Sequence, residues 1–283
     1  NFINWDGVIL TDSGGFQGWS LPTKIIDDGI NFKNIYDGSN FLMTPKLSIE
    51  TQNILGSDIA MIFDCLININ DPKEKQIEAI NLTRKWGDET IKNHKNNKQA
   101  LFGIIQGGLH KDLRELSAKY MIDQEYDGYA IGGLAIGESR EERKEIVSYT
   151  IDILPENKPR YVMGLGDTHG LIDLIEEGVD LFDCVWPSRL ARHGKLIDGN
   201  EYINIKNSRY KDDIDPINKD CPCYTCKNYS KAFLRHLIQN EPTSSWLYLT
   251  VHNLIQTEII LDEARESILK SNFKSFKEKY KNE

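Results

Sequence analysis

The sequence has no run of about 18 apolar residues, so we expect no transmembrane helix in this chain of 283 residues. It also lacks the succession of basic, apolar and small residues that marks a signal peptide, so we expect none. The first residue is Asn1 rather than methionine, and Asp6-Gly7 leads directly into the apolar run Val8-Ile9-Leu10. We therefore expect a piece of a longer protein.

Cysteines are few, and acidic residues outnumber basic ones by 43 to 34. Five cysteines are present, and three of them fall within six positions. An odd number in this arrangement argues against a disulfide framework and for a reducing compartment, so we expect a cytoplasmic protein. The net charge of −9 disfavours a general nucleic-acid binder, although a local basic surface can differ from the total.

Short apolar runs alternate with longer helical patterns. The expected strands are Val8–Thr11, Ile59–Phe63, Phe102–Gln106, Gly128–Ile131, Tyr161–Leu165, Leu181–Cys184 and Tyr202–Ile205. Helices are expected over residues 45–55, 72–95, 110–124, 140–153 and 169–177. This α/β alternation predicts βα units and a parallel sheet, either in a (β/α)8 TIM barrel or in an open doubly wound sheet. No G-x-G-x-x-G fingerprint follows the first strand, which weakens a dinucleotide-binding interpretation.

Two of the helix starts carry capping signals, and the tail has a different pattern. Thr44-Pro45 gives an N-cap followed by proline, and Ser139 with Glu142 forms a capping box. After the barrel-like part, helical patterns cover Lys231–Gln239 and Trp246–Leu269. The highly charged residues 270–283 are expected to be a solvated helix end.

A cluster of metal-type ligands lies near the C-terminus. Cys221, Cys223 and Cys226 are followed by His252, and His236 is the rival for the fourth position. Thiolates and an imidazole suit Zn²⁺, and four protein ligands leave no open coordination position. The sequence therefore predicts one structural zinc ion.

Polar residues and glycines follow most of the expected strands. They are Asp12 and Ser13, Asp64, Gln106-Gly107-Gly108, Gly132-Gly133-Leu134, Met163-Gly164 and Asp183. In a parallel barrel the carboxyl ends of the strands carry function, so these residues are expected to meet. Two carboxylates facing one sugar carbon indicate glycosidic chemistry. A third carboxylate beside an amide and backbone N–H groups suits the edge of a purine.

Five strings closely resemble the tRNA-guanine transglycosylases: TDSGGFQ at 11–17, GIIQGG at 103–108, YAIGGLAIGE at 129–138, YVMGLG at 161–166 and LFDCVWPSR at 181–189. The resemblance covers nearly the whole chain and includes the spacing that favours His252. It implies one TIM-barrel catalytic domain over residues 1–283, with a zinc-binding subdomain at 212–255. It also implies that the N-terminal part and first barrel strand are missing from this chain.

The family exchanges the wobble guanine of tRNAs with GUN anticodons for a 7-deazaguanine base in the queuosine pathway, and its members form homodimers. By this resemblance Asp183 is the nucleophile and Asp12 the general acid/base. The base would be held by Ser13, Phe16, Asp64, Gln106, Gly132, Gly133, Leu134 and Met163. The anticodon loop would be held by Arg189 and Arg192, within a local basic strip that offsets the acidic total.

One position departs from the family pattern. Leu66 stands where bacterial members carry a cysteine near the base, whereas members that use queuine itself carry an apolar residue there. This suggests that a bulkier base is accepted. The alternatives are a relative that acts on DNA or on another tRNA position, or a noncatalytic tRNA-binding subunit, which the presence of Asp12, Asp64 and Asp183 disfavours. None of the expected strands ends in a lysine that could form a Schiff base, which counts against an aldolase-like barrel enzyme.

Overall fold

The computed structural model describes residues 3–34 and 36–281. The chain divides into two compact units. The first contains the residues up to Met163 together with Glu177–Leu181, and the second contains Gly164–Glu176 together with the residues from Phe182 onward. Each unit is described by itself. Within the described ranges, no helix is long and apolar enough to cross a membrane.

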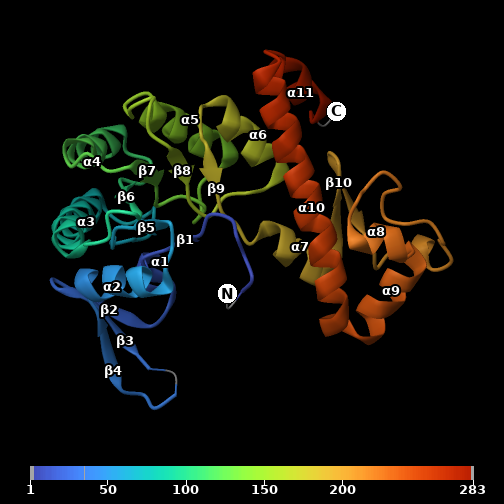
Figure 1. The fold of residues 1–283 in the computed structure, drawn as a ribbon, viewed down its shortest axis with the longest axis horizontal. Helices are drawn as coiled ribbons and strands as arrows, with labels where there is room; N and C mark the ends of the chain where they lie inside the picture. Colours follow the sequence, from blue (N-terminus) through green and yellow to red (C-terminus); the bar gives the residue numbers. More distant parts are fainter. Residues whose placement is uncertain (1–2, 35, 282–283) are drawn as a thin grey trace. The chain divides into compact units, whose positions relative to one another are not determined.

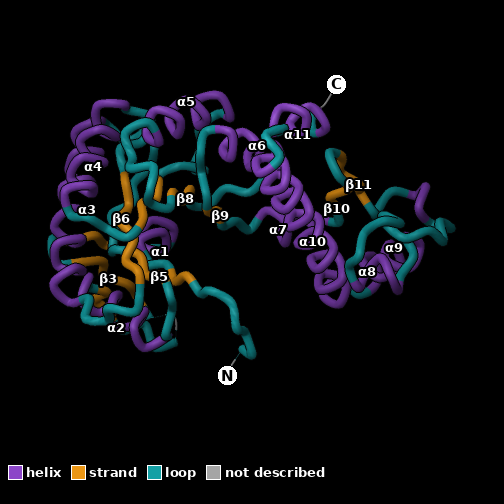
Figure 2. The backbone as a smooth tube through the Cα atoms, turned by 45° about the horizontal axis from the view of Figure 1, so that its top comes forward, coloured by secondary structure: helices purple, strands orange, loops and turns teal. Residues whose placement is uncertain are grey.

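A six-stranded sheet organises the first unit. Its order is β1 (Leu10–Thr11), β5 (Ile59–Met61), β6 (Ala100–Ile105), β7 (Gly128–Ile131), β8 (Arg160–Val162) and β9 (Leu181–Phe182). The pairs from β1 to β8 are parallel. Each strand of the sheet lies beside the next one along the chain, which is the order of a barrel and not the reversing order of a doubly wound sheet. The sheet is curled (Figure 2), and the predicted barrel-type α/β class is confirmed.

The helices of this unit lie where the capping signals place them. Figure 1 shows α3 (Lys73–Asn93), α4 (Lys111–Asp123) and α5 (Arg140–Ile151) side by side on the outside of the sheet. Thr44 caps α2 (Pro45–Leu55) by accepting from the Leu47 N–H, and Ser139 and Glu142 form the predicted capping box of α5. Because these signals are local, the sequence gives the starts of both helices correctly.

A small antiparallel sheet between β1 and α2 was not predicted. It contains β2 (Thr23–Ile26), β3 (Gly29–Lys33) and β4 (Asn40–Met43), and it follows the short helix α1 (Gly15–Ser20). The hairpin between β2 and β3 turns at Asp27-Asp28 before Gly29. Ile30 of β3 is buried against Phe63 and Trp86, so this sheet packs beside the end of β5.

The second unit is mainly helical. It contains α6 (Thr168–Glu176), α7 (Trp186–His193), β10 (Lys195–Asp198), β11 (Glu201–Asn204), η1 (Ser208–Tyr210), α8 (Tyr224–Asn228), α9 (Lys231–Asn240), α10 (Pro242–Leu269) and α11 (Phe273–Lys279). The buried Asn253 of α10 joins two of these elements, since its amide nitrogen donates to the carbonyls of Pro187 and Lys195 and its oxygen accepts from the Ile197 N–H.

The expectation of a solvated helix end over residues 270–283 is wrong for its buried aromatic residues, although most of the described residues in this range are exposed and residues 282–283 lie outside the described part. The chain turns at Ser271, which has a φ of 54°, and α11 then buries Phe276 and Tyr280 in the core of the second unit. The aromatic residues at positions 273, 276 and 280 have helical spacing and form one apolar face. High charge on the other face concealed this pattern.

Candidate active site and metal centre

Asp64 is a buried carboxylate just beyond the end of β5. Its side chain accepts a hydrogen bond from the Gln106 amide nitrogen at 2.6 Å and another from the Ser13 hydroxyl at 3.5 Å. All three residues are at least 95% buried. Burial, followed by the negative charge of Asp12, raises the pKa of Asp64 to about 7, although the two hydrogen bonds lower it. The structure therefore brings together residues that the sequence places at three separate strand ends.

Gly15 allows the loop after β1 to approach this carboxylate. A Cβ atom on Gly15 would lie 1.9 Å from Asp64 Oδ1 and 2.8 Å from the Asp64 carbonyl oxygen. No side chain fits in that space without displacing Asp64. The loop is also fixed from outside the site, because the buried Ser48 hydroxyl of α2 donates to the Ser13 carbonyl at 2.7 Å.

The Gln106 amide packs against a glycine pair at the end of β7. A Cβ on Gly132 would lie 2.9 Å from the Gln106 amide nitrogen, and one on Gly133 would lie 2.6 Å from its amide oxygen. Gly133 also has a φ of 68°, which favours glycine. The Gln106 amide is thus held between one buried carboxylate and a glycine backbone, an arrangement that suits the polar edge of a flat ring.

The loop after Gly133 is held by a carboxylate. Glu138, whose side chain is 1% exposed, accepts from the backbone N–H groups of Ala135 at 2.7 Å and Ile136 at 3.1 Å. Ala135 has a φ of 62°, an unusual conformation for a residue with a side chain. Leu134 is buried at the start of this loop.

The remaining predicted residues of the first unit differ in exposure. Asp12 is exposed beside the buried Asp64, and its charge acts on that carboxyl. Phe16 is 49% exposed, and its ring lies 5.7 Å from that of Trp19. Met163 is half-buried, and its N–H donates to the Ile131 carbonyl at the end of β7. An exposed aromatic ring next to Gly15, which lies against Asp64, is available to stack on a ligand.

Asp183 follows β9 and belongs to the second unit. Its Oδ1 accepts from the Gly164 N–H at 2.8 Å, which orients the carboxylate while it stays exposed. The sulfur of the next residue, Cys184, would lie 1.9 Å from a Cβ on Gly166, so the segment after β8 requires glycine at that position. Arg189 and Arg192 are exposed on α7.

The four predicted metal ligands form one buried cluster. One ligand atom from each of Cys221, Cys223, Cys226 and His252 lies within 4.8 Å of the others. His252 Nδ1 faces the three sulfur atoms at 3.3 to 3.7 Å, and its Nε2 lies 2.8 Å from the Ile197 carbonyl oxygen. A ring fixed through its second nitrogen is typical of metal-binding histidines. The cluster could hold a metal ion.

His236 is not part of this cluster. It is exposed on α9, where it contacts the side chain of Asn240 at 3.3 Å. The structure therefore decides between the two candidate histidines in favour of His252.

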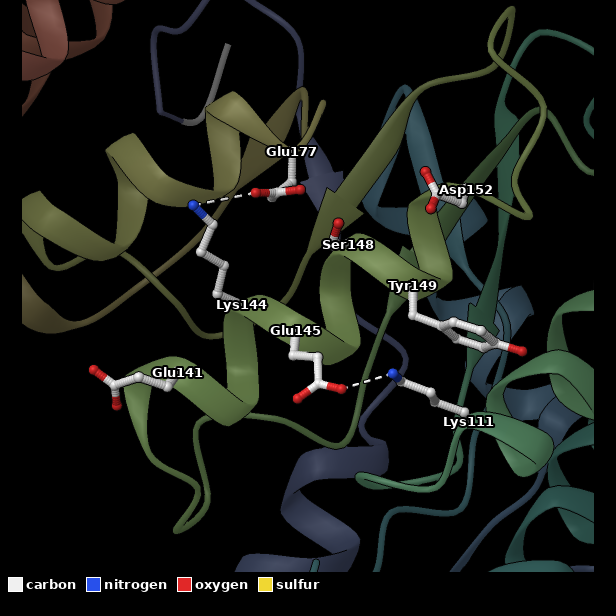
Figure 3. A pocket seen from close by; sticks show the side chains of 8 residues that line it. All are labelled: Lys111, Glu141, Lys144, Glu145, Ser148, Tyr149, Asp152 and Glu177. Carbon is white, nitrogen blue, oxygen red and sulfur yellow. Dashed lines mark hydrogen bonds and ion pairs between the residues drawn. The ribbon is translucent and has the colours of Figure 1, made fainter. Parts of the chain in front are cut away.

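A shallow hollow of about 500 Å³ lies on the surface of α4 and α5 (Figure 3). Both lysines that line it are already paired, Lys111 with Glu145 at 2.6 Å and Lys144 with Glu177 at 3.2 Å. Paired and solvated charges of this kind offer little to a base or a sugar. The hollow is therefore a poor candidate for the functional site.

Sequence reasoning missed several residues that support the site. They are Gly15, Ser48, Arg114, Ser117 and Glu138. Gly15 and Glu138 lie inside the quoted strings, but no local pattern predicts what they touch. Ser48, Arg114 and Ser117 lie inside helices, where they resemble ordinary polar positions.

A barrel-type α/β fold with polar residues gathered at its strand ends defines the chain as a barrel enzyme. A model of the queuine tRNA-ribosyltransferase family matches residues 1–283. The chain is 43% identical to the queuine tRNA-ribosyltransferase of Fusobacterium nucleatum, in an alignment that covers 99% of this chain and 76% of the relative. It is 44% identical to that of Caldanaerobacter subterraneus (99% and 75%) and 41% identical to that of Streptococcus thermophilus (99% and 74%).

The chain belongs to the queuine tRNA-ribosyltransferase family, a family of transferases that modify tRNA. The membership inferred from the five strings is thereby confirmed. The residues quoted for the resemblance are the ones that the fold places at strand ends and in the cysteine cluster.

Proposed function

We propose that this enzyme exchanges the wobble guanine of tRNAs with GUN anticodons for a 7-deazaguanine base. The observation that carries the proposal is the buried Asp64 carboxylate, which is bonded to a Gln106 amide that packs beside Gly133, in a chain of this family. A carboxylate accepts hydrogen bonds from ring N–H groups, while an amide N–H and a backbone N–H donate to a carbonyl. Together they match one edge of a guanine-type base.

The base would be enclosed from several directions. Asp64 accepts from the N–H groups of the purine edge, and Gln106 and the Gly133 N–H donate to the base carbonyl. Phe16 and Met163 cover the two faces of the ring by stacking and by thioether contact. The remaining predicted contacts are the Leu134 carbonyl, which would face the substituent at position 7, and Ser13 and Gly132, which order the pocket.

The exchange requires two displacements at one sugar carbon. An Asp183 oxygen attacks ribose C1′, the bond from C1′ to the guanine nitrogen breaks, and Asp12 gives a proton to the departing guanine. Asp12 then takes a proton from the incoming 7-deazaguanine base, whose nitrogen attacks C1′ and releases Asp183. Two inversions retain the configuration at C1′, as in retaining glycosidases. The target base must leave the anticodon loop to reach the site, and Arg189 and Arg192 would hold that loop.

The cysteine cluster fits a structural zinc ion. Cys221, Cys223, Cys226 and His252 would fill a tetrahedral shell, and bound zinc would supply folding free energy rather than chemistry. We also propose that residues 212–255 form a zinc-binding subdomain, that the enzyme is a homodimer, and that it is located in the cytoplasm. The five cysteines are free of disulfides in the structure, which suits a reducing compartment.

A trapping experiment tests the function. The protein is incubated with an unmodified tRNA that has a wobble guanine, together with a competing 7-deazaguanine base, and then denatured. We expect a denaturant-resistant adduct of RNA and protein, because Asp183 forms an ester with the ribose. Asp183→Asn should abolish the adduct, and an unchanged adduct in that variant would overturn the assignment of the nucleophile.

The same experiment separates the alternatives. A duplex DNA substrate or a tRNA without the wobble guanine should give no adduct. Adduct formation on DNA alone would indicate the DNA-modifying relative. RNA binding without adduct or exchange would indicate a noncatalytic subunit.

A further inference from the structure

Arg114 is a buried cation on α4 that the proposed reaction does not use. Its side chain is 0% exposed, and it reaches from the first turn of α4 to the backbone at the ends of β6 and β7. Nε donates to the Gly108 carbonyl at 2.9 Å, and Nη1 donates to the carbonyls of Ile105 at 2.9 Å and Gly132 at 2.8 Å. One guanidinium thus joins the two loops that carry Gln106 and Gly133.

The stability of the helix does not account for this charge. Burial removes the hydration of the guanidinium, and it lowers the pKa of Arg114 to about 9, although the charge of Glu138 opposes this. Nη2 is buried and has no hydrogen-bond partner in the described parts of the chain. An apolar side chain of similar size would avoid the loss of hydration but would take the donor away from the three carbonyls, so the charge is retained with its hydrogen bonds to the two loops.

The contact with Gly132 fixes a neighbouring donor. The Gly132 carbonyl and the Gly133 N–H belong to one peptide group, and in a planar trans peptide they point in opposite directions. A hydrogen bond to the oxygen therefore sets the direction of the N–H. Because the donor is a cation, it also polarises the peptide group and makes the N–H a stronger donor.

The peptide group before Gln106 is held in the same way from both sides. Its carbonyl, that of Ile105, accepts from Arg114, and its N–H donates to the Ser117 hydroxyl at 3.1 Å. Arg114 and Ser117 are three residues apart and share one face of α4. A single helix face therefore fixes both groups that are proposed to donate to the base carbonyl.

We propose that Arg114 is a positioning residue for recognition of the base carbonyl. It aims and polarises the Gly133 N–H and, together with Ser117, holds Gln106 so that both donors meet one oxygen. This inference rests on the proposed function, since it requires a guanine-type base in this pocket.

The test compares two bases that differ at the carbonyl. The probes are 7-deazaguanine and its 6-thio counterpart, which keeps the ring N–H groups but presents sulfur, a weaker acceptor. Dissociation constants are measured by calorimetry. The dissociation constant of the 6-thio base divided by that of 7-deazaguanine reports how strongly the site prefers oxygen to sulfur, and this quotient is called the ratio below. The proteins are the wild type, Arg114→Lys, Ser117→Ala and Lys119→Met, with circular dichroism as the check of folding.

We expect Arg114→Lys to reduce the ratio about tenfold, because one ammonium group does not reproduce the planar donor set of a guanidinium. Ser117→Ala should reduce it by a smaller factor. Lys119→Met removes an exposed cation from the same helix and should leave the ratio unchanged. Equal weakening of both bases in a folded Arg114→Lys protein would show a merely structural role and overturn the inference.

Two further outcomes also test the inference. If Arg114→Lys does not fold, the inference is tested by Ser117→Ala alone, and an unchanged ratio in that variant rejects it. If the wild type binds neither base, the proposed function fails. If the wild type prefers oxygen to sulfur and neither variant alters that preference, only the inference fails.

Discussion

At the scale of single residues, the unusual group is Asp64, a carboxyl that burial and the charge of Asp12 hold at a pKa of about 7. Only its ionised form can accept two hydrogen bonds from the N–H edge of a base. Binding of the base therefore favours the carboxylate, and protonation competes with binding. This gives the site a dependence on pH in the neutral range, where an ordinary aspartate has none.

We predict that affinity for 7-deazaguanine falls as the pH is lowered through 7, by about tenfold per unit below the pKa. The sign follows from the raised pKa, because below it the free protein carries the proton that binding must remove. Calorimetric titrations between pH 5.5 and 8 measure this. Asp64→Asn should bind weakly and show no slope, and a flat profile in the wild type would contradict the assignment.

Asp12→Asn should move the same titration to lower pH. The substitution removes the negative charge that raises the pKa of Asp64, while burial, the larger cause, remains. The midpoint of the binding profile should fall but stay above that of an exposed aspartate. An unchanged midpoint would mean that the two carboxyl groups do not interact.

Leu66 is the residue that bears on the size of the base. It is 92% buried, and its Cδ1 lies 3.8 Å from the position of a Cβ on Gly133. We propose that this apolar wall favours queuine over the aminomethyl base. Competitive exchange assays with both bases measure the preference, and Leu66→Cys should shift it toward the smaller one. Equal or better use of the aminomethyl base by the wild type would contradict this proposal.

At the scale of elements, the loop that leads into α1 depends on Gly15. Gly15→Ala should displace Asp64 and raise the KM for the base by roughly 100-fold, since a shift of about 1 Å in a binding group can have that effect. Gly56→Ala at the end of α2 is the control. Gly56 has a φ of 73° but open space around it, so this variant should lose stability while keeping its KM. Similar KM values in the two variants would argue against a special role for Gly15.

Elements differed in how well the sequence predicted them. α2 matches its expected bounds of 45–55, and β7 matches Gly128–Ile131, because capping residues and apolar runs act locally. β5 ends at Met61, two residues before its predicted end. The three strands β2 to β4 were missed because they are short and are mostly half-buried or exposed, and their one strong signal is Asp28-Gly29.

At the scale of the whole molecule, the metal cluster is part of a core and not an appendage. Cys221, Cys223 and Cys226 are buried in the second unit together with residues such as Leu196, Leu234 and Leu249, from β10, α9 and α10. The metal ion would therefore hold the core of that unit together. Its removal should loosen the unit, and catalysis should be lost only as a consequence.

We predict one zinc ion per chain by elemental mass spectrometry, none in His252→Ala, and one in His236→Ala, whose histidine is exposed outside the cluster. Hydrogen exchange should show faster exchange of α8 and α10 after chelation. Immediate loss of exchange activity in a protein whose second unit remains protected would show that the metal takes part in chemistry.

The sequence by itself determined the α/β class, the main helices, the family strings and the three cysteine ligands, because capping, apolar periodicity and ligand spacing are properties of neighbouring residues. Only the tertiary structure decided that Gln106 bonds Asp64, 42 residues away, and that Arg114 holds the Gly132 carbonyl. It also chose His252 over His236. These contacts join different strands and helices, so their geometry depends on how the whole sheet packs and on no local pattern.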